Sequence, residues 1–358
     1  MIAPVQIGEK LLASEELINF CLQSGLRVAL ISDRRVASLL GDKFLRHLQN
    51  RSVDVELFTF AEGELSKTRE TKMRLEDEML AKGFRKETLI LALGGGVTLD
   101  LAGFLAANFC RGVPWVSLPT SLLAMVDGCI GGKTGVNTPL GKNLVGALYH
   151  PQMVLIDTTT LRTLPLKEVR NGIVEMVKHG VIADAAYFSL IESKLEKVQA
   201  LHIDIAHEAI EGSCRIKQKL CREEISHRGK RSLLAFGHTI GHAIEKVSHY
   251  SVPHGEAIAL GMIAEAYISY RQGKLDFTSF ERIERVLREN HPGLALEPNI
   301  SSKKLWEAIG ADRKEPQFVM LSKIGAPLEC EGKWRMQVKE KLLAHALDWL
   351  CDALHCYP

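Results

Sequence analysis

Short apolar runs alternate with helical stretches over the first 158 residues of the chain. Apolar runs with strand composition predict β-strands at 28–33, 53–60, 88–93, 115–119 and 153–157. Apolar side chains spaced three or four apart predict helices at 35–49, 67–82 and 97–107. Strands that alternate with helices in this way are typical of an α/β domain with a parallel sheet.

From residue 159 onward the strand signals fade and helical periodicity dominates. Helices are predicted at 161–181, 185–219, 256–273 and 277–291. Near the end, we expect short helices after Pro298, a hairpin of 318–323 with 333–338, and a C-terminal helix. The sequence therefore predicts two domains, an α/β domain over 1–158 and an all-α domain over 159–358.

Composition narrows the class of protein. The chain has 358 residues, is 46% hydrophobic and 25% charged, and carries a net charge of +2, so neither nucleic acid nor a membrane is expected as a partner. Its start lacks the pattern of a signal peptide, and no apolar run is long enough to span a bilayer. The eight cysteines include no CxxC pair, which favours free thiols in a cytoplasmic protein. A metal site would then use histidine and carboxylate ligands.

The stretch 236–256 concentrates candidate chemistry. His238 and His242 lie four residues apart, so on a helix they share one face, and His254 follows after a break at Pro253. Three converging imidazoles fit a catalytic zinc site, which takes three protein ligands and keeps one position open. A packed or surface histidine is the ordinary alternative for any one of them. The spacing favours a metal or catalytic site but does not choose the ligands.

A glycine triplet, Gly94 to Gly96, follows a predicted strand and opens a predicted helix. Glycine lets the backbone approach a pyrophosphate, and a helix N-terminus attracts anions, so a nucleotide site is favoured over a simple tight turn. The spacing is not GxGxxG. Asp100, expected in the first helical turn, could cap the helix or contact a ribose. Asp33, at the end of another strand, is a further ribose candidate.

Residues 127–146 are rich in glycine and contain Lys133, Lys142, Asn137 and Asn143. A loop that wraps a phosphorylated or polyhydroxy ligand is predicted, with a purely structural loop as the alternative. Because the glycine triplet and the histidine stretch fall in different domains, we expect the active site in the cleft between them.

Seven motifs in one order resemble the 3-dehydroquinate synthase family: GGGVTLDLAGFLAA, PTSLLAMVDGCIGGKTGVN, GKNLVG, LRTLP, GIVEMVKHG, FGHTIGHAIE and HGEAIALGM. The resemblance covers residues 20–330. It implies a Rossmann-like domain that binds NAD, a helical domain that holds Zn²⁺, with Co²⁺ as a possible substitute, and a homodimer. The implied metal ligands are Glu175, His238 and His254, which makes His242 a residue of the active site that does not bind the metal.

The implied substrate is 3-deoxy-D-arabino-heptulosonate 7-phosphate, converted to 3-dehydroquinate and phosphate by transient oxidation, phosphate elimination, re-reduction and an intramolecular aldol closure. The resemblance places its carboxylate on Lys217 and Arg231. Its phosphate would contact Lys133, Asn143, His242, Lys314, and Arg111 of the neighbouring subunit, while Asp127 and Lys178 match further active-site positions. The positions implied for NAD are Asp33, Glu64, Lys67, Gly95, Gly96, Val97, Asp100, Thr120, Ser121, Lys133, Lys142 and Thr163.

Three departures from the family pattern concern the substrate contacts. Ala235 stands where the family usually has asparagine, the segment 222–227 reads REEISH, and the family's DKK is DRK at 312–314. The alternatives are another sugar-phosphate cyclase, for which Ala235 is the reason, a metal-dependent polyol dehydrogenase, and a metal-stabilised binding protein without activity. The lysine-bearing segment argues against the dehydrogenase, because a polyol has no phosphate to bind.

Overall fold

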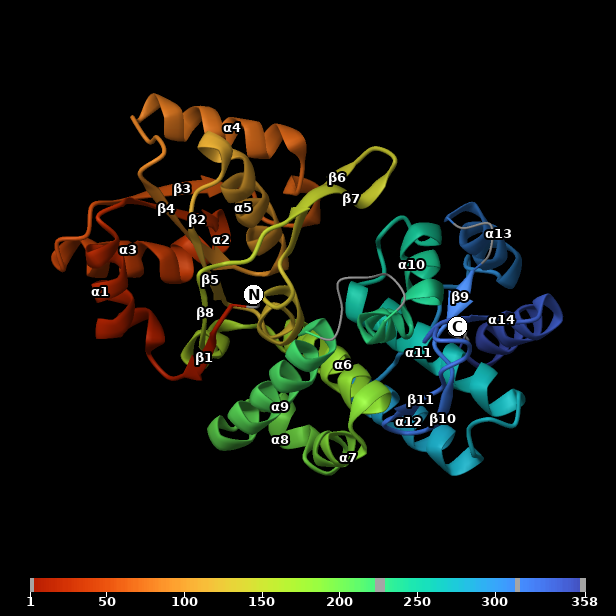
Figure 1. The fold of residues 1–358 in the computed structure, drawn as a ribbon. Helices are drawn as coiled ribbons and strands as arrows, with labels where there is room; N and C mark the ends of the chain where they lie inside the picture. Colours follow the sequence, from red (N-terminus) through yellow and green to blue (C-terminus); the bar gives the residue numbers. More distant parts are fainter. Residues whose placement is uncertain (1–2, 223–228, 313–315, 355–358) are drawn as a thin grey trace. The chain divides into compact units, whose positions relative to one another are not determined.

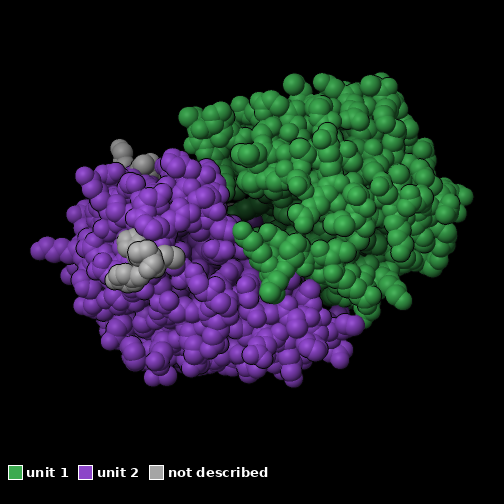
Figure 2. Space-filling model, turned by 180° about the vertical axis from the view of Figure 1, so that it is seen from behind, with its two compact units in different colours: residues 1–168 green, residues 169–358 purple. Residues whose placement is uncertain are grey.

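A computed structural model describes residues 3–222, 229–312 and 316–354. The chain forms two compact units, Met1–Glu168 and Val169–Pro358, which are coloured separately in Figure 2. The division lies ten residues beyond the expected boundary at 158. The intervening turn η6 (Thr158–Thr163) belongs to the first unit, because the Thr158 hydroxyl donates to the Gly8 carbonyl at 3.2 Å.

The first unit contains a six-stranded sheet in the order β1-β8-β5-β4-β2-β3, and each neighbouring pair is parallel (Figure 1). The five predicted strands are present, and β1 is an additional edge strand that the sequence pattern did not reveal. The strands are β1 (Val5–Gly8), β2 (Arg27–Asp33), β3 (Val55–Phe60), β4 (Thr88–Gly94), β5 (Trp115–Pro119) and β8 (Met153–Asp157).

Both faces of this sheet are covered, as expected for buried parallel strands. Leu89, Leu91 and Leu93 of β4 pack in one cluster with apolar side chains of α1 and α3, and the intervening residues of β4 point to the opposite face, where α5 lies. The expected helix at 35–49 is divided by a π-helical turn, η2 (Ala37–Gly41). The helices are α1 (Glu15–Ser24), α2 (Arg34–Val36), α3 (Asp42–Asn50), α4 (Arg69–Ala81) and α5 (Gly96–Asn108).

The glycine-rich segment is not the irregular loop that was predicted. It forms an antiparallel hairpin of β6 (Lys133–Thr138) and β7 (Gly141–Leu148), which extends as an arm from the sheet in Figure 1. A side chain at Gly146 would overlap the Thr134 carbonyl of the facing strand. Several of the glycines therefore permit close strand pairing, which the composition alone did not distinguish from a ligand loop.

The second unit is predominantly helical, as predicted (Figure 1). Its central helix α11 is buried on nearly all sides and crosses α10 closely, because Gly237, Gly241 and Gly261 leave no side chains at the crossing. The helices are α6 (Leu166–Ala183, whose first turn belongs to the first unit), α7 (Ala185–Ser193), α8 (Leu195–Gln199), α9 (Ile203–Arg222), α10 (His238–Val247), α11 (His254–Arg271), α12 (Phe277–Asn290), α13 (Ser302–Asp312) and α14 (Glu340–Leu354).

The predicted C-terminal hairpin is correct in one part only. β9 (Gln317–Phe318) pairs with β12 (Met336–Gln337), whereas β10 (Leu321–Lys323) pairs with β11 (Ala326–Pro327). The difference arises at Gly325, whose φ of 79° allows a tight reversal that the hydrophobic pattern did not reveal.

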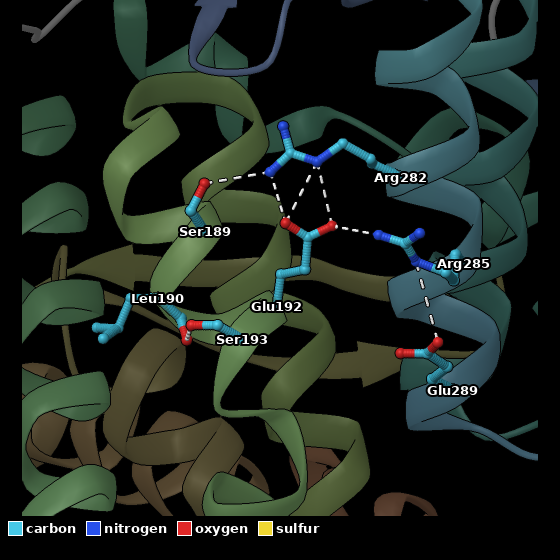
Figure 3. Close-up of polar contacts among 7 residues, drawn as sticks. All are labelled: Ser189, Leu190, Glu192, Ser193, Arg282, Arg285 and Glu289. Carbon is cyan, nitrogen blue, oxygen red and sulfur yellow. Dashed lines mark hydrogen bonds and ion pairs between the residues drawn. The ribbon is translucent and has the colours of Figure 1, made fainter.

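A charged network joins α7 to α12 (Figure 3). Glu192 accepts from Arg282 Nη2 at 2.5 Å and from Arg285 Nη2 at 2.8 Å, and Arg282 also donates to the Ser189 hydroxyl at 3.1 Å. The Arg282 hydrogen bonds hold the pKa of Glu192 below its ordinary value. Such a forked arginine–carboxylate contact fixes the relative orientation of two helices more than it adds stability.

None of the described helices combines the length and the apolar character that crossing a bilayer requires. No disulfide links any of the cysteines that the structure describes.

Candidate active site

The carboxyl ends of β2 and β4 form the point where the order of the sheet reverses. After β3 the chain crosses β2 and continues as β4 on the other side of β2. Ligands of open α/β sheets bind in the crevice at such a point. Asp33 ends β2 and Gly94 ends β4, and the Thr98 hydroxyl reaches Asp33 Oδ2 at 3.4 Å. The other Asp33 oxygen accepts from the Val36 amide at 3.0 Å.

The glycine triplet provides an open helix N-terminus. Gly95 is the N-cap of α5 and supplies no side-chain cap, so the first amide groups of the helix remain available to an anion. A Cβ atom at Gly96 would have no neighbour within 4 Å, whereas one at Gly94 would overlap the Thr98 side chain. This cradle fits the pyrophosphate of NAD. Asp100 is the fifth residue of α5, so its expected place in the first turn was wrong.

A cluster of polar side chains lies on the same unit. The Lys67 ammonium group, whose residue is only 4% exposed, forms an ion pair with Asp100 and donates to Asn143 Oδ1 at 2.6 Å. Glu64 accepts from the Asn137 side chain at 2.7 Å, and the Asn137 amide donates to the Lys67 carbonyl at 2.8 Å. Burial raises the pKa of Asp100, and Lys67 opposes this effect. The structure therefore gathers several residues that sequence reasoning had assigned separately.

The remaining predicted residues of this unit lie around the sheet and the hairpin. The Thr120 amide donates to the Gly94 carbonyl at 3.0 Å, and Ser121 Oγ accepts from the Ala124 amide at 3.3 Å. Val97 is the second residue of α5, Asp127 lies in η5 (Ala124–Gly128), Lys133 begins β6 and Lys142 lies in β7. Thr163 ends η6 and, among the described residues, forms no hydrogen bond with the Lys67 cluster.

Arg111 lies in a strained turn after α5. Cys110 has a φ of 49° and Arg111 a φ of 71°, which are unfavourable left-handed conformations for residues with side chains. The Arg111 side chain is exposed. Consecutive strained residues persist where the surrounding structure maintains them, and such positions cluster at functional sites.

Glu175, His238 and His254 converge in the second unit. Each offers one ligand atom, and these three atoms lie within 4.8 Å of one another. Glu175 projects from the middle of α6, whereas the two histidines are the first residues of α10 and α11. His238 Nε2 lies 3.8 Å from Glu175 Oε1. Three separate helices thus build one potential metal site.

The Nδ1 atoms of both histidines face oxygen acceptors. His238 Nδ1 lies 3.1 Å from the Phe236 carbonyl, and His254 Nδ1 lies 3.4 Å from Glu245 Oε1. Donation from Nδ1–H leaves the Nε2 lone pairs available to a metal. Burial lowers the pKa of His238 well below its ordinary value, and Lys178 lowers it further. Burial opposes protonation of His254, but Glu245 outweighs it and raises the pKa.

The donor set fits a divalent metal such as zinc. Glu175 Oε1 is buried and has no hydrogen-bond partner among the residues that the structure describes, while Lys178 forms an ion pair with Oε2 of the same carboxylate. A carboxylate oxygen and two imidazole nitrogens are ligands that catalytic zinc sites commonly use, with one position left open.

Glu245 is a residue that the sequence reasoning missed. It lies seven residues after His238 and three after His242, so the helical period places it on the same face of α10. The motif HTIGHAIE therefore contained the necessary signal. Together with His242 and His254, Glu245 also forms a second possible ligand set that shares His254 with the first.

The other predicted residues of this unit occupy different elements. The His242 side chain is 55% exposed, and its ring centroid lies 5.2 Å from that of His238. Lys217 is a buried residue of α9, and Arg231 is half-buried in η7 (Lys230–Ala235). Lys314 lies outside the described residues.

Comparison with known proteins identifies the family. The sequence model of the 3-dehydroquinate synthase N-terminal domain matches residues 57–171, and that of the C-terminal domain matches 172–315. A curated 3-dehydroquinate synthase of Nitrosospira multiformis is 39% identical over 328 residues, which cover 90% of this chain and 89% of that protein.

Two solved structures are also similar at 27% identity. One is 2-deoxy-scyllo-inosose synthase complexed with carbaglucose-6-phosphate, NAD⁺ and Co²⁺, with a TM-score of 0.87 and coverage of 96% of each chain. The other is 2-epi-5-epi-valiolone synthase from Streptomyces hygroscopicus with NAD⁺ and Zn²⁺, with a TM-score of 0.88 and coverage of 98% of this chain and 97% of that one. With both family models matched in order and a curated relative aligned over nearly the whole length, this chain belongs to the 3-dehydroquinate synthase family.

Proposed function

We propose that this chain converts 3-deoxy-D-arabino-heptulosonate 7-phosphate to 3-dehydroquinate and inorganic phosphate. The convergence of Glu175, His238 and His254 is the observation that carries the proposal, because it supplies a metal site to a chain whose family and glycine cradle already indicate NAD. Bound NAD supplies a reversible hydride acceptor, and a bound divalent metal supplies a Lewis acid that polarises the substrate oxygen to be oxidised.

The residues around the glycine cradle would hold the cofactor. The N-terminus of α5 presents the amide groups of Gly95, Gly96 and Val97 to the pyrophosphate. Asp33, at the carboxyl end of β2, would accept a hydrogen bond from a ribose hydroxyl. The remaining proposed cofactor contacts come from the polar cluster, the end of β5, the hairpin and η6: Glu64, Lys67, Asp100, Thr120, Ser121, Lys133, Lys142 and Thr163.

Substrate orientation would depend on cationic groups. Arg231 presents a planar fork to the carboxylate, and Lys217 adds a point charge that burial strengthens. Lys178 balances the charge of Glu175 and, with Asp127, completes the proposed active site. The proposed phosphate contacts are Lys133, Asn143, His242, Lys314, and the Arg111 side chain of a second subunit.

A homodimer would explain two features of the first unit. Arg111 is exposed and lies in a turn whose left-handed backbone conformation costs energy. A contact of the Arg111 side chain with the active site of a neighbouring subunit would offset this cost. The hairpin exposes Leu140 at 91%, Leu144 at 64% and Leu148 at 63%, an apolar surface that a partner would cover. The absence of disulfides among the described cysteines is compatible with a cytoplasmic enzyme.

The decisive experiment measures phosphate release from the heptulosonate phosphate with catalytic NAD, with and without a chelator, while NADH absorbance is followed in the same sample. Chelator-sensitive phosphate release without net NADH is expected. Net NADH from polyols without phosphate release would instead identify a dehydrogenase.

Absence of both signals would indicate a different phosphosugar. Ala235, the last residue of η7, is the specific reason to test that alternative, since the family usually carries asparagine there. In that case Ala235→Asn is the first variant to assay. If it gains phosphate release from the heptulosonate, the substrate contact at this position decides the specificity.

A further inference from the structure

The carboxylate of Glu245 lies between two active-site histidines. Its side chain is 5% exposed, Oε1 lies 3.4 Å from His254 Nδ1, and Oε2 lies 4.0 Å from His242 Nε2. The Glu245 carbonyl accepts from the Tyr250 amide at 2.7 Å and from the Ser248 hydroxyl at 3.0 Å. The residue is therefore anchored at the C-terminal end of α10, and its buried charge is directed at the histidines.

Two of the possible ligand sets share His254, and one of these two contains Glu245. One set is Glu175, His238 and His254, and the other is His242, Glu245 and His254. The same Glu245 oxygen cannot both bind an ion and accept fully from His254 Nδ1–H. A protonated Nδ1 directs the free lone pair of His254 to Nε2, away from Glu245.

Burial and hydrogen bonding favour the first set. The Glu175 side chain is 2% exposed and the His238 side chain 20%, whereas that of His242 is 55% exposed. His238 already donates from Nδ1 to the Phe236 carbonyl, the same arrangement that Glu245 provides for His254. When a histidine binds a metal through one ring nitrogen, the N–H of its other ring nitrogen usually donates to a carboxylate, a backbone carbonyl or water.

We infer that Glu245 is a positioning residue: it accepts from His254 Nδ1–H, fixes the tautomer and orientation of that ring, and thereby selects the set of Glu175, His238 and His254 over the set that contains His242. The inference rests on the metal role in the proposed function. It goes beyond that role because it assigns the choice between two possible metal positions to a residue that does not itself bind the metal.

The first test measures zinc affinity in purified protein by competition with a chromophoric chelator. Outer-shell carboxylates of this kind change metal affinity by about 10–100-fold. Glu245→Ala is expected to weaken zinc binding within that range, and Glu245→Gln to weaken it less, because the amide oxygen still accepts from Nδ1–H. Glu256→Gln is the matched control, since it removes an acid two residues from His254 that, within the described part of the chain, forms no ion pair with the His254 ring. The zinc affinity of this variant is expected to equal that of the wild type.

The second test separates positioning from ligation. In the Co²⁺-substituted protein, Glu245→Gln is expected to keep the visible spectrum of the wild type, and His242→Ala to keep both spectrum and affinity. In the metal-free protein labelled with ¹⁵N-histidine and held at alkaline pH, where the ring is neutral, His254 is expected as the Nδ1–H tautomer, with the Nε2–H form gaining population in Glu245→Ala.

Three results would overturn the inference. Wild-type zinc affinity in both Glu245 variants would exclude any role, whereas loss of affinity in His242→Ala together with a changed Co²⁺ spectrum in Glu245→Gln would make Glu245 a ligand. An unchanged His254 tautomer in a folded Glu245→Ala protein would also contradict it. If Glu245→Ala does not fold, Glu245→Gln still supplies the affinity and the spectrum. A wild type that binds zinc without turnover would refute the proposed function alone.

Discussion

At the scale of single residues, two glycines of the cradle serve different purposes. Gly94 is required by packing, because a side chain there would overlap Thr98. A Cβ atom at Gly96 would meet no such neighbour, so packing does not require glycine there. We attribute this glycine to the close approach of a ligand. Substitutions at these two positions therefore form a matched pair that tests the proposed NAD site.

Gly96→Ala is expected to fold normally and to gain up to about 1 kcal/mol, because alanine favours the helix. Its NAD affinity is expected to fall about 10-fold or more, since the new methyl group occupies the space of a close pyrophosphate contact. Thermal melts and NAD titration measure the two effects. Gly94→Ala is the counterpart and is expected to lose stability. Wild-type NAD affinity in Gly96→Ala would place the pyrophosphate elsewhere.

His249 shows a second residue-scale effect. It is exposed after α10 and has a φ of 51°, followed by Tyr250 with a φ of 64°. A left-handed conformation costs a residue with a side chain about 1–2 kcal/mol, whereas glycine adopts it freely. Because glycine also loses more entropy on folding, His249→Gly is expected to raise the free energy of unfolding by about 0.5–1 kcal/mol. Urea denaturation checks this, with His207→Gly inside α9 as a control that is expected to destabilise.

At the scale of elements, a buried acid lies at the crossing of α10 and α11. Glu265 of α11 is fully buried near the N-terminus of α10, and no hydrogen bond of good geometry reaches its oxygens from the residues that the structure describes. Burial raises the pKa of Glu265 to about 8, against the opposing effects of the Gly237 amide and the Arg335 guanidinium. A group that resists ionisation therefore lies beside the start of the helix that carries His238.

This shift predicts a pH dependence of stability. Between the ordinary carboxyl pKa near 4.5 and the folded value of about 8, the folded state retains a proton that the unfolded chain loses. Stability attributable to Glu265 is therefore lost as pH rises through this window. Relative to the wild type, Glu265→Gln is expected to gain on the order of 3 kcal/mol between about pH 5.5 and pH 8.5. Urea titrations of both proteins measure it, and parallel pH profiles would show that Glu265 ionises normally.

At the scale of the whole molecule, the proposed contribution of Arg111 to a second subunit can be tested by complementation. Arg111→Ala and His238→Ala are each expected to lose activity about 10-fold or more, since one loses a charged phosphate contact and the other a metal ligand. In a mixed dimer, the site that retains His238 receives the intact Arg111 of the other subunit. One wild-type site is therefore restored per mixed dimer.

The measurement compares phosphate release by the two variants alone and after co-expression with different affinity tags. Activity of the doubly purified mixture well above either variant alone is the expected outcome. If Arg111 instead serves the active site of its own subunit, both sites of the mixed dimer carry a defect and activity stays low. The tags report in the same experiment whether a dimer forms.

Much of the fold and of the site could be predicted from the sequence because the signals are local. Five of the six strands of the sheet, the helical second unit and the position of the glycine triplet follow from periodicity and turn chemistry within one element. The pairing of His238 and His242 on one helical face has the same origin. The choice of Glu175 as the third ligand beside His238 and His254 came from motifs and not from spacing, because Glu175 lies on another helix.

Other features were decided by tertiary structure alone. Composition could not distinguish a ligand loop from the hairpin β6–β7, since close strand pairing and ligand wrapping both require glycine. The reversal at Gly325 redirected β10 to β11. The spacing within α10 places Glu245 on the face of His238 and His242, but its contact with His254 exists only because α11 packs against α10. The sequence by itself thus determined most of the helices and strands and the residues that carry the chemistry. Which side chains meet depends on packing between distant segments, which no local period encodes.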